Sequence, residues 1–372
     1  MAELYVGMVS GTSLDGLDTA LVELDADGCR VVRARTTPFP EPLGDRLAAL
    51  VADPRTDLRD LGALDITLAE FAADCVLALL ADAGREADEI AAIGFSDHTI
   101  FHQPLPPHAF TLQLGDPNTI AARTHITTVA DMRRMDVALG GQGAPVMPAL
   151  HEWQFADAGE IRVVVNIGGI ANLTCLHPGR PVTGFDSGPG NALMNAWTQL
   201  GGGGPFDRDG EWAQGGNVVN ALLRHFRSDE YFSLPSPKST GLEHFNLAWV
   251  QRAVAEAPDT APADIQATLL ELTATTIADA IRASEPDVER VILCGGGAYN
   301  GALVRRLEAL VKPAVLETSE AHGLEPEWVE AAGFAWLARA RLHDQAGNLP
   351  SVTGAREPAV LGGVYSEKTP NG

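Results

Sequence analysis

The sequence predicts an α/β protein of two domains, and three observations lead to that prediction. The chain has 372 residues, which is too long for one ordinary hydrophobic core. Apolar, strand-like runs alternate with segments whose apolar residues recur at helical spacing. Two strand-turn-strand units of the same plan, at 4–24 and 161–176, each enclose a polar turn that contains glycine. We therefore expect two related domains, 1–130 and 131–372, with the C-terminal segment packing back on the first.

Capping residues mark the helix boundaries in the first half of the chain. The helical pattern at 61–83 stops at Gly84, which suits the left-handed conformation at a helix C-terminus. A later helix begins at Asp116 and Pro117, because Asp can serve as N-cap and Pro fits the first helical position. Strands are expected at 4–9, 19–24 and 91–95, with a hairpin turn at Asp15-Gly16.

The second half continues the alternation of strands and helices. The expected strands are 162–167, 170–176, 288–294 and 314–316. One helix is expected directly after Pro189, and further helices are expected at 217–226, 262–284, 300–311 and 326–343. The tail, 347–372, is rich in Gly and Pro and is expected to be mostly loop.

The net charge excludes two classes of partner. At -23, the protein repels nucleic acid phosphates and anionic lipid headgroups. No stretch reaches the ~18 apolar residues of a membrane span, and the N-terminus has no basic region followed by an apolar segment. We therefore expect a cytoplasmic protein that binds neither nucleic acid nor membrane. The scattered cysteines at 29, 75, 175 and 294 predict reduced, buried thiols and no zinc site.

Glycine-rich turns supply candidate phosphate contacts. An acidic protein that binds a nucleotide needs local positive potential from backbone N–H groups, a few Lys or Arg, and Mg²⁺. Four such turns follow strand-like runs, at 11–13, 168–169, 184–190 and 295–297. Each alone is explained as well by glycine's freedom at positive φ, but together they favour nucleotide binding. None matches a Walker P-loop or a Rossmann fingerprint.

Ordered sequence blocks across nearly the whole chain carry a resemblance to a known family. These blocks are Gly7–Asp18, Ala130–Pro145, Asn166–Thr174, Phe185–Asn191, Pro237–Glu243, Cys294–Asn300, Glu330–Ala338 and Val352–Ala355. Together they resemble the anhydro-N-acetylmuramic acid kinase family, which is part of the sugar kinase, heat-shock protein and actin superfamily. The resemblance implies two ribonuclease-H-like (actin-like ATPase) domains with an interdomain active-site cleft, ATP and Mg²⁺ as cofactors, and a homodimer.

The reaction that the resemblance implies joins hydrolysis to phosphoryl transfer. ATP and water convert 1,6-anhydro-N-acetylmuramic acid to N-acetylmuramic acid 6-phosphate and ADP, in peptidoglycan recycling. One carboxylate then suffices, because the phosphoryl group captures the departing oxygen that a glycosidase would protonate. We assign that base to Asp186, although Asp186 or Ser187 could instead cap the following helix. Glu330 is a second catalytic candidate, or an ordinary first-turn Glu.

The resemblance also implies which residues bind the nucleotide. Gly11, Thr12, Ser13, Leu14, Asp15, Gly16, Leu17 and Asp18 match the first phosphate loop, and Asn166, Gly168, Gly169 and Gly188 belong to the second and its neighbouring turn. Gly295, Gly296 and Gly297 would let the backbone approach the adenosine. Asp15 could hold Mg²⁺ through water, or merely shape the turn, and no other metal ligand is assigned. Lys238 could meet a phosphate, or lie solvated on the surface.

Three residues are candidates for binding the amino sugar. Arg133 can hold the lactyl carboxylate in bidentate fashion, and Gln142 can serve the acetamide. His98 lies where the family has a His-Gly-Gln-Thr block, which residues 95–99 largely replace here. Asn195 stands where many relatives carry Asp, which is a further reason to choose Asp186 as the base.

Three other classes of function are compared with the sequence by the features that each would need. The nearest alternative is a kinase of the same superfold that phosphorylates an ordinary sugar hydroxyl without consuming water. An actin-like or heat-shock-like ATPase would need a large additional client-binding region. A serine hydrolase is excluded at 94–98, because the nucleophile elbow lacks its final Gly.

Overall fold

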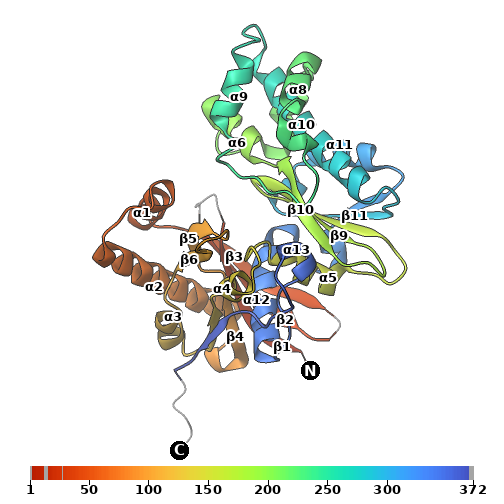
Figure 1. Cartoon of the computed structure of the whole chain (residues 1–372). Helices are drawn as coiled ribbons and strands as arrows, with labels where there is room; N and C mark the ends of the chain where they lie inside the picture. The colour runs from red at the N-terminus through yellow and green to blue at the C-terminus, as the bar shows by residue number, and fades with distance from the viewer. Residues whose placement is uncertain (1, 12–15, 27, 368–372) are drawn as a thin grey trace, which may run out of the picture. The chain divides into compact units, whose positions relative to one another are not determined.

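A computed structural model describes residues 2–11, 16–26 and 28–367, and the chain divides into two compact units (Figure 1). Unit 1 comprises Met1–Gln154 and Trp328–Gly372, and unit 2 comprises Phe155–Glu327. The division differs from the expected boundary at 130/131. The segment 131–154 belongs to unit 1 because it bonds there: Asp131 N–H donates to Asp97 at 2.8 Å, and Gln154 accepts from Cys29 N–H at 2.9 Å.

Unit 1 is built on a six-stranded mixed sheet with the order β13-β7-β4-β1-β2-β3. Its strands are β1 (Glu3–Ser10), β2 (Gly16–Leu24), β3 (Cys29–Pro38), β4 (Ile90–Phe95), β7 (Thr128–Ala130) and β13 (Gly363–Tyr365), and β5 (His98–Gln103) pairs with β6 (Phe110–Leu114) separately. Its helices are α1 (Glu41–Ala52), α2 (Leu58–Ala83), η1 (Ala87–Glu89), α3 (Pro117–Thr124), α4 (Arg134–Ala138), α5 (Met147–Phe155), α12 (Val329–Leu342) and α13 (Pro350–Thr353). β1 pairs antiparallel with β2 and parallel with β4.

The two faces of the unit 1 sheet are covered in different ways. Val6 and Met8 of β1 pack with the apolar residues of α2 in one buried cluster. On the other face, a Cβ on Gly7 would lie 1.8 Å from the carbonyl oxygen of Ala331, and one on Gly94 would lie 1.9 Å from that of Phe334. Helix α12 therefore approaches β1 and β4 backbone to backbone, at positions where only glycine fits.

Unit 2 repeats the plan with a five-stranded sheet in the order β10-β9-β8-β11-β12. Its strands are β8 (Arg162–Ile167), β9 (Ile170–Leu176), β10 (Thr183–Pro189), β11 (Arg290–Cys294) and β12 (Val315–Thr318). Its helices are α6 (Ala192–Leu200), η2 (Arg208–Gly210), α7 (Glu211–Gln214), α8 (Asn220–Arg227), η3 (Glu230–Ser233), α9 (Leu247–Val254), α10 (Pro262–Ser284), η4 (Gly296–Tyr299), α11 (Gly301–Val311) and η5 (Ser319–His322), and η6 (Pro326–Trp328) ends at the unit boundary.

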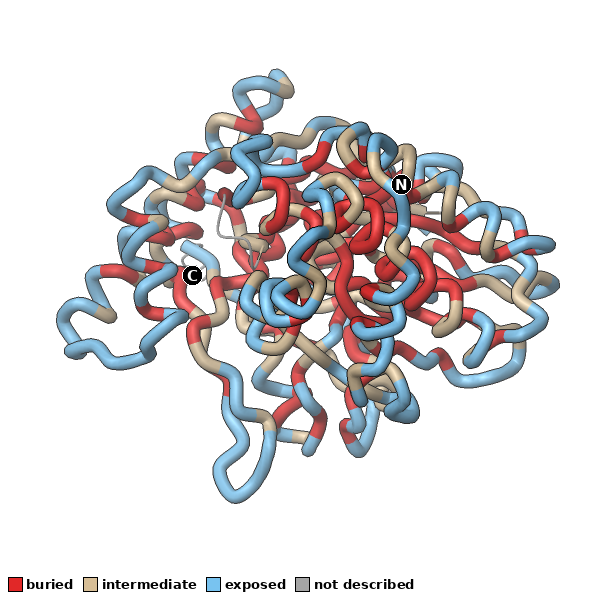
Figure 2. Tube along the Cα trace, turned by 90° about the horizontal axis from the view of Figure 1, so that it is seen from above, coloured by how far each residue is buried: buried red, intermediate tan, exposed pale blue. Residues whose placement is uncertain are grey.

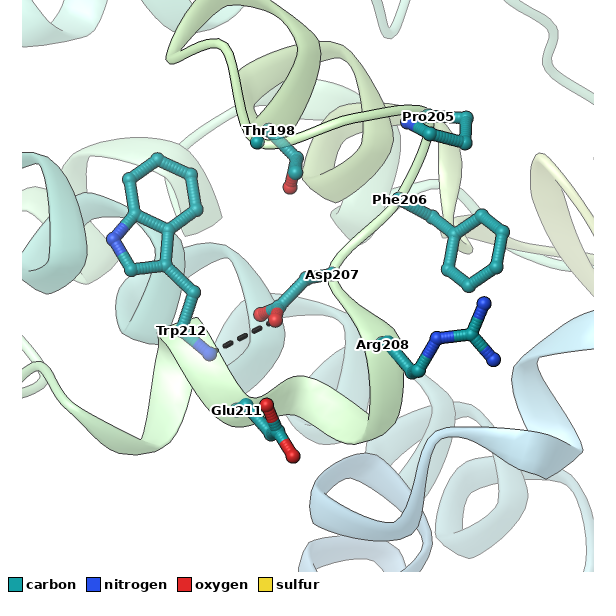
Figure 3. Close-up of a pocket in the computed structure, with 8 residues that line it drawn as sticks. Thr198, Pro205, Phe206, Asp207, Arg208, Glu211 and Trp212 are labelled. Carbon is teal, nitrogen blue, oxygen red and sulfur yellow. Dashed lines mark hydrogen bonds between the residues drawn. The ribbon is translucent and has the colours of Figure 1, made fainter.

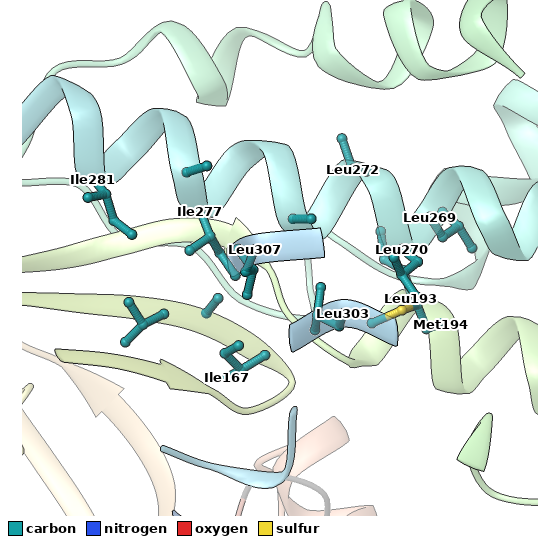
Figure 4. Packing of buried hydrophobic residues seen from close by; sticks show 14 of the residues in the cluster. Ile167, Leu193, Met194, Leu269, Leu270, Leu272, Ile277, Ile281, Leu303 and Leu307 are labelled. Carbon is teal, nitrogen blue, oxygen red and sulfur yellow. The ribbon is translucent and has the colours of Figure 1, made fainter. Parts of the chain in front are cut away.

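The core of unit 2 lies on one face of its sheet. Alternate residues of β8 and β9, such as Val165 and Leu173, pack there against α10 and α11. Figure 4 shows Ile277 and Ile281 of α10 pointing toward the strands. Figure 2 shows that the outlying turns of the chain are largely exposed.

The predicted α/β class is confirmed, with differences in detail. Residues 29–38, 41–52, 98–114, 147–155 and 247–254 form elements that the sequence reading did not anticipate. The tail is not all loop, since β13 pairs with β7. The four cysteines are buried and free. Within the described ranges no helix has both the length and the apolarity to cross a membrane.

Candidate active site

The first glycine turn can be described only at its two ends. Thr12, Ser13, Leu14 and Asp15 lie outside the described residues. Gly11 follows β1, and Gly16 begins β2 in close approach to the carbonyl oxygen of Thr37. Leu17 is fully buried in the core, so its side chain serves packing, and Asp18 accepts a 2.5 Å hydrogen bond from Thr36.

The second glycine turn is fixed by backbone hydrogen bonds to the start of α6. Gly190 N–H donates to Gly169 at 2.9 Å, and Asn191 N–H donates to Gly168 at 2.8 Å. An added Cβ would meet no atom closer than 3.5 Å at Gly168 or 3.7 Å at Gly169. A side chain at either position would therefore make only ordinary van der Waals contacts, so packing within the chain does not by itself require glycine there.

Two other glycines in the expected set are explained by packing. Gly188 has a φ of 142°, and an added Cβ would lie 2.7 Å from the Phe232 ring. Gly297 packs on Ile167, with an added Cβ 2.3 Å from its Cγ2 atom. These positions need glycine whether or not a nucleotide is bound.

The glycine turn at 295–297, between β11 and η4, lies beside the one at 168–169. Gly295 has a φ of 78°, and an added Cβ would lie 2.3 Å from Oδ1 of Asn166. At Gly296 an added Cβ would meet Nδ2 of Asn191 at 4.0 Å and no nearer atom of the described residues. The structure thus brings Asn166 and these two glycine turns together in unit 2.

Strand register places a row of polar residues across the unit 2 sheet. Asp186 of β10 pairs with Asn172 of β9, and Asn172 pairs with Asn166 of β8. Their strand neighbours Phe185 and Leu173 belong to the core, so the polar row lies on the opposite face. Sequence reasoning did not select Asn172 as a site residue, although it occupies a polar position in the same block as Asn166.

Hydrogen bonds fix the backbone of Asp186 and one of its two carboxylate oxygens. Its Oδ2 atom accepts hydrogen bonds from the Ser239 hydroxyl at 2.9 Å and from Thr240 N–H at 3.0 Å. Its backbone N–H donates to Lys238 at 3.0 Å, and its carbonyl oxygen accepts from the Tyr231 hydroxyl at 2.7 Å. Oδ1 has no hydrogen-bond partner among the residues that the structure describes. Burial raises the pKa of this carboxyl above its ordinary value.

The structure excludes the capping alternative for Asp186 and the solvated alternative for Lys238. Neither Asp186 nor Ser187 caps α6, because the Ser187 hydroxyl donates to Ala171 and α6 has no side-chain cap. Lys238 is not a solvated surface residue: its Nζ atom donates to the Tyr231 carbonyl at 2.9 Å and lies 4.5 Å from the centroid of the Tyr231 ring.

In unit 1, polar residues gather where β4 and β7 end. Asp97 and Asp131 follow these strands, both at positive φ, 53° and 61°. Oδ2 of Asp97 accepts from Asp131 N–H, and its Oδ1 atom is buried without a partner among the described residues. Burial raises the pKa of Asp97 to about 8. Sequence reasoning did not select this carboxyl.

The expected sugar-binding residues lie in the same unit. His98 contacts the Ser10 hydroxyl through Nδ1 at 3.0 Å, and burial lowers its pKa to about 4, which keeps the ring neutral. Arg133 donates to the Gly143 carbonyl at 3.0 Å, next to the exposed Gln142. Burial lowers the pKa of Arg133, while Asp97 and Glu330, in the first turn of α12, raise it. The structure thus groups Arg133 with the carboxyls of Asp97 and Glu330. Gln142 is the residue before Gly143, whose carbonyl oxygen accepts the hydrogen bond from Arg133.

A separate cavity of about 340 Å³ in unit 2 contains none of these residues (Figure 3). Asp207 in its wall accepts from the N–H groups of Trp212 at 2.9 Å and Ala213 at 3.0 Å, and so holds the start of α7. This carboxylate is fully used by the fold. Across the described part of the chain, no three His, Cys, Asp or Glu side chains gather as metal ligands would.

The fold and the glycine turns define the class of protein. In unit 1, β1 continues through the antiparallel pairs β1–β2 and β2–β3 on one side and the parallel pairs β1–β4 and β4–β7 on the other. In unit 2, β8 continues in the same way through β9 and β10 on one side and β11 and β12 on the other. Two such sheets, each opening with a hairpin around a glycine turn, form the duplicated ribonuclease-H-like fold of the actin-like ATPases.

Comparison with known proteins narrows this class to one family. The model of the family described as anhydro-N-acetylmuramic acid kinase matches residues 3–367. The protein of that name from Coxiella burnetii (strain RSA 493 / Nine Mile phase I) is 47% identical over 366 residues, covering 98% of this chain and 97% of that protein. The one from Saccharophagus degradans is 46% identical over 367 residues, covering 98% and 99%. The chain belongs to the anhydro-N-acetylmuramic acid kinase family, and it is an enzyme of the phosphotransferase class.

Solved structures with low sequence identity are also similar. The activator of the 2-hydroxyisocaproyl-CoA dehydratase from Clostridium difficile with bound ADPNP is 12% identical with a TM-score of 0.47, covering 92% of this chain and 96% of that one. A ROK family glucokinase from Streptomyces griseus in complex with glucose and AMPPNP is 13% identical with a TM-score of 0.41, covering 90% and 99%.

Proposed function

We propose that the chain uses ATP and water to open 1,6-anhydro-N-acetylmuramic acid and to phosphorylate its 6-oxygen, giving N-acetylmuramic acid 6-phosphate and ADP. The relatives that carry this kinase name support the substrate. The observation that carries the mechanism is the Asp186 carboxyl, whose Oδ2 atom is fixed by two donors while Oδ1 has no partner within the described chain.

Asp186 acts in this proposal as a general base. Oδ1 accepts a proton from water as the water oxygen attacks the anomeric carbon, and the bond from that carbon to the 6-oxygen breaks. The 6-oxygen takes the γ-phosphoryl group of ATP, so no acid is required to protonate it. Attack from the face opposite the departing oxygen inverts the anomeric centre. The raised pKa of Asp186 makes its carboxylate a better proton acceptor than an exposed one.

The glycine turns fit a nucleotide. At Gly168, Gly169 and Gly296 no atom of the chain comes closer than 3.5 Å to an added Cβ, and the absence of a side chain would let phosphate and adenosine approach the backbone N–H groups. Such neutral donors suit a protein of net charge -23, which offers few cations to a phosphate.

Magnesium is compatible with this site. The ion commonly takes one or two carboxylates and completes its shell with phosphate oxygens and water, so it needs no cluster of three protein ligands. We assign Asp15 as a ligand through water. The ion would supply positive charge to the β- and γ-phosphate oxygens. Chelation should abolish ADP formation, and added Mg²⁺ should restore it.

The unit 1 residues would bind the sugar. The guanidinium of Arg133 would pair with the lactyl carboxylate, and its Nε atom is buried without a partner among the described residues. Gln142 would serve the acetamide and His98 a sugar hydroxyl. Glu330, whose charge acts on Arg133, would orient that guanidinium or the reacting water.

A coupled ADP assay with the anhydro sugar tests the proposal. Asp186→Asn should lower kcat by roughly 100- to 10,000-fold, since general-base catalysis contributes about that much. Asp88→Asn, on an exposed turn of unit 1, is the control and should leave kcat unchanged. Heavy-oxygen water should label the anomeric oxygen of the product. A product without label would instead favour the alternative, a kinase acting on an ordinary sugar hydroxyl.

We further propose that the enzyme works in the cytoplasm, where ATP is supplied, on sugar released during peptidoglycan recycling. A homodimer is expected from the family. Light scattering on the purified chain, with and without nucleotide, would measure its mass.

A further inference from the structure

We propose that Ser239 is a positioning residue for Asp186, fixing the carboxylate so that Oδ1 alone is presented to water. The inference rests on the proposed function, because it takes Asp186 as the base. Its basis is the pair of hydrogen bonds to Oδ2, at 2.9 Å from Ser239 Oγ and at 3.0 Å from Thr240 N–H.

The segment that carries these donors is itself anchored. The ammonium group of Lys238 donates to the carbonyl of Tyr231 at 2.9 Å and lies over the Tyr231 ring. The Lys238 carbonyl accepts from Asp186 N–H at 3.0 Å, and the Tyr231 hydroxyl donates to the Asp186 carbonyl at 2.7 Å. Residues 238–240 therefore enclose the backbone and one carboxylate oxygen of Asp186.

A second layer holds Tyr231 in place. Asp229 accepts from Tyr231 N–H at 3.0 Å, from Trp249 Nε1 at 2.9 Å, and contacts His244 Nε2 at 3.0 Å. Tyr231 also packs edge-on against Phe245, with ring centroids 5.5 Å apart. The segment that carries the serine hydroxyl is thus bonded to Tyr231, which is itself held by hydrogen bonds and ring packing.

Two physical effects follow from the Ser239 hydrogen bond. It blocks rotation of the carboxylate plane, so the free lone pairs of Oδ1 keep one direction. It also stabilises the ionised form of Asp186 and so opposes part of the rise in pKa that burial causes. Without this donor, only the Thr240 N–H would oppose the effect of burial, and the pKa of Asp186 would lie higher than it does in the unaltered chain.

The other charged groups near Asp186 do not replace this donor. Glu243 raises the pKa of Asp186 by repulsion, and the Tyr231 hydroxyl is committed to a carbonyl oxygen. The Lys238 ammonium group points to carbonyls of Tyr231 and Phe232. Asn172, which pairs with Asp186 across β9, carries no charge.

The test compares Ser239→Ala and Ser239→Thr with Ser233→Ala. Ser233 lies in the same region, but its hydroxyl donates to Glu230 and makes no bond to Asp186. Ser239 is exposed, so removing its hydroxyl leaves the fold intact, which circular dichroism checks. We expect Ser239→Ala to lower kcat at least about tenfold with unchanged KM for sugar and ATP, and to move the acid limb of the pH profile upward by about one unit. Ser239→Thr should restore both quantities.

A direct titration separates this inference from the proposed function. Carbon-13 NMR of the Asp186 carboxyl should show a higher pKa in Ser239→Ala than in the unaltered chain or in Ser233→Ala, without any turnover. An unchanged pKa together with an unchanged pH profile in Ser239→Ala would overturn the positioning role, even if Asp186→Asn is inactive. Failure of the unaltered chain to release ADP from the anhydro sugar would instead count against the proposed function.

Discussion

The two units share a strand order but surround their site carboxyls with different numbers of donors. In unit 2, Asp186 receives two donors on Oδ2, which oppose the rise in its pKa that burial causes. In unit 1, Asp97 accepts one backbone donor and keeps its other oxygen buried without a partner in the described chain, and burial raises its pKa to about 8. The sheet places each carboxyl, and the loops packed on it set how many donors oppose the effect of burial.

The units also differ in how helices cover their sheets. In unit 1 the backbone of α12 lies against Gly7 and Gly94, which leaves no room for side chains. In unit 2, α10 and α11 reach the sheet through Ile277 and Leu303, which are fully buried. The α12 face of the unit 1 sheet should therefore be intolerant of added atoms, and the α10–α11 face of the unit 2 sheet of removed ones.

Gly94→Ala should have the largest effect on stability. The new Cβ would lie 1.9 Å from a backbone oxygen that cannot rotate away, so we expect a loss of more than about 3 kcal/mol. Hydrogen exchange followed by mass spectrometry should show faster exchange in β1, β4 and α12. Faster exchange confined to unit 2 would contradict the packing described for unit 1.

Leu303→Ala should destabilise unit 2 by about 2–5 kcal/mol, because it leaves a cavity beneath α11. Exchange should accelerate in α10, α11 and the adjoining strands, and peptides of unit 1 serve as the internal control. Leu303→Met should cost less, since it largely keeps the volume.

Asp97 should make stability depend on pH. Its folded pKa of about 8 exceeds its ordinary value of 3.8, so the folded chain binds this proton more tightly and loses stability as pH rises from about 4 to about 8. Asp97→Asn removes that component. In urea unfolding, the free energy of unfolding of the variant relative to that of the unaltered chain should rise by at least about 1 kcal/mol from pH 5 to pH 8. The opposite trend of His98, whose pKa is lowered to about 4, is common to both proteins and cancels.

Gly62→Ala should give the smallest change, and with the opposite sign. Gly62 lies inside α2 with no atom within 4 Å of an added Cβ, so alanine should stabilise the helix by about 0.5–1 kcal/mol. It also serves as the matched control for Gly94→Ala. A loss of stability here would mean that the two glycines do not differ as the packing indicates.

The sequence predicted the features that local chemistry controls. The strands around 4–9 and 162–167 follow from apolar runs, and the cap at Gly84 follows from its left-handed conformation, observed at φ 63°. The unit boundary at 154/155 differs from the expected 130/131 because the bonds that hold 131–154 in unit 1, such as that between Cys29 and Gln154, join residues far apart in the chain. Strand β3 was missed because its outward residues are polar and charged.

Parts of the site were hidden for similar reasons. Asn172 enters the site only through its register with Asp186, which a single strand does not reveal. Asp97 was overlooked because a residue's φ and burial cannot be seen in a sequence. Ser239 was within a recognised block, but its bond to a residue 53 positions away depends on the tertiary fold.

The return of the last chain segment to the first sheet has a consequence for biosynthesis. The ribosome releases residues 155–327 before α12 exists, so unit 2 can complete its core while the nascent chain is still growing. The glycine-lined face of β1 and β4 stays bare until the end of translation, when α12 covers it. A chain truncated after residue 327 would thus contain a complete unit 2 and a unit 1 whose sheet lacks α12 on one face. We expect chaperones and proteases to act on that uncovered face.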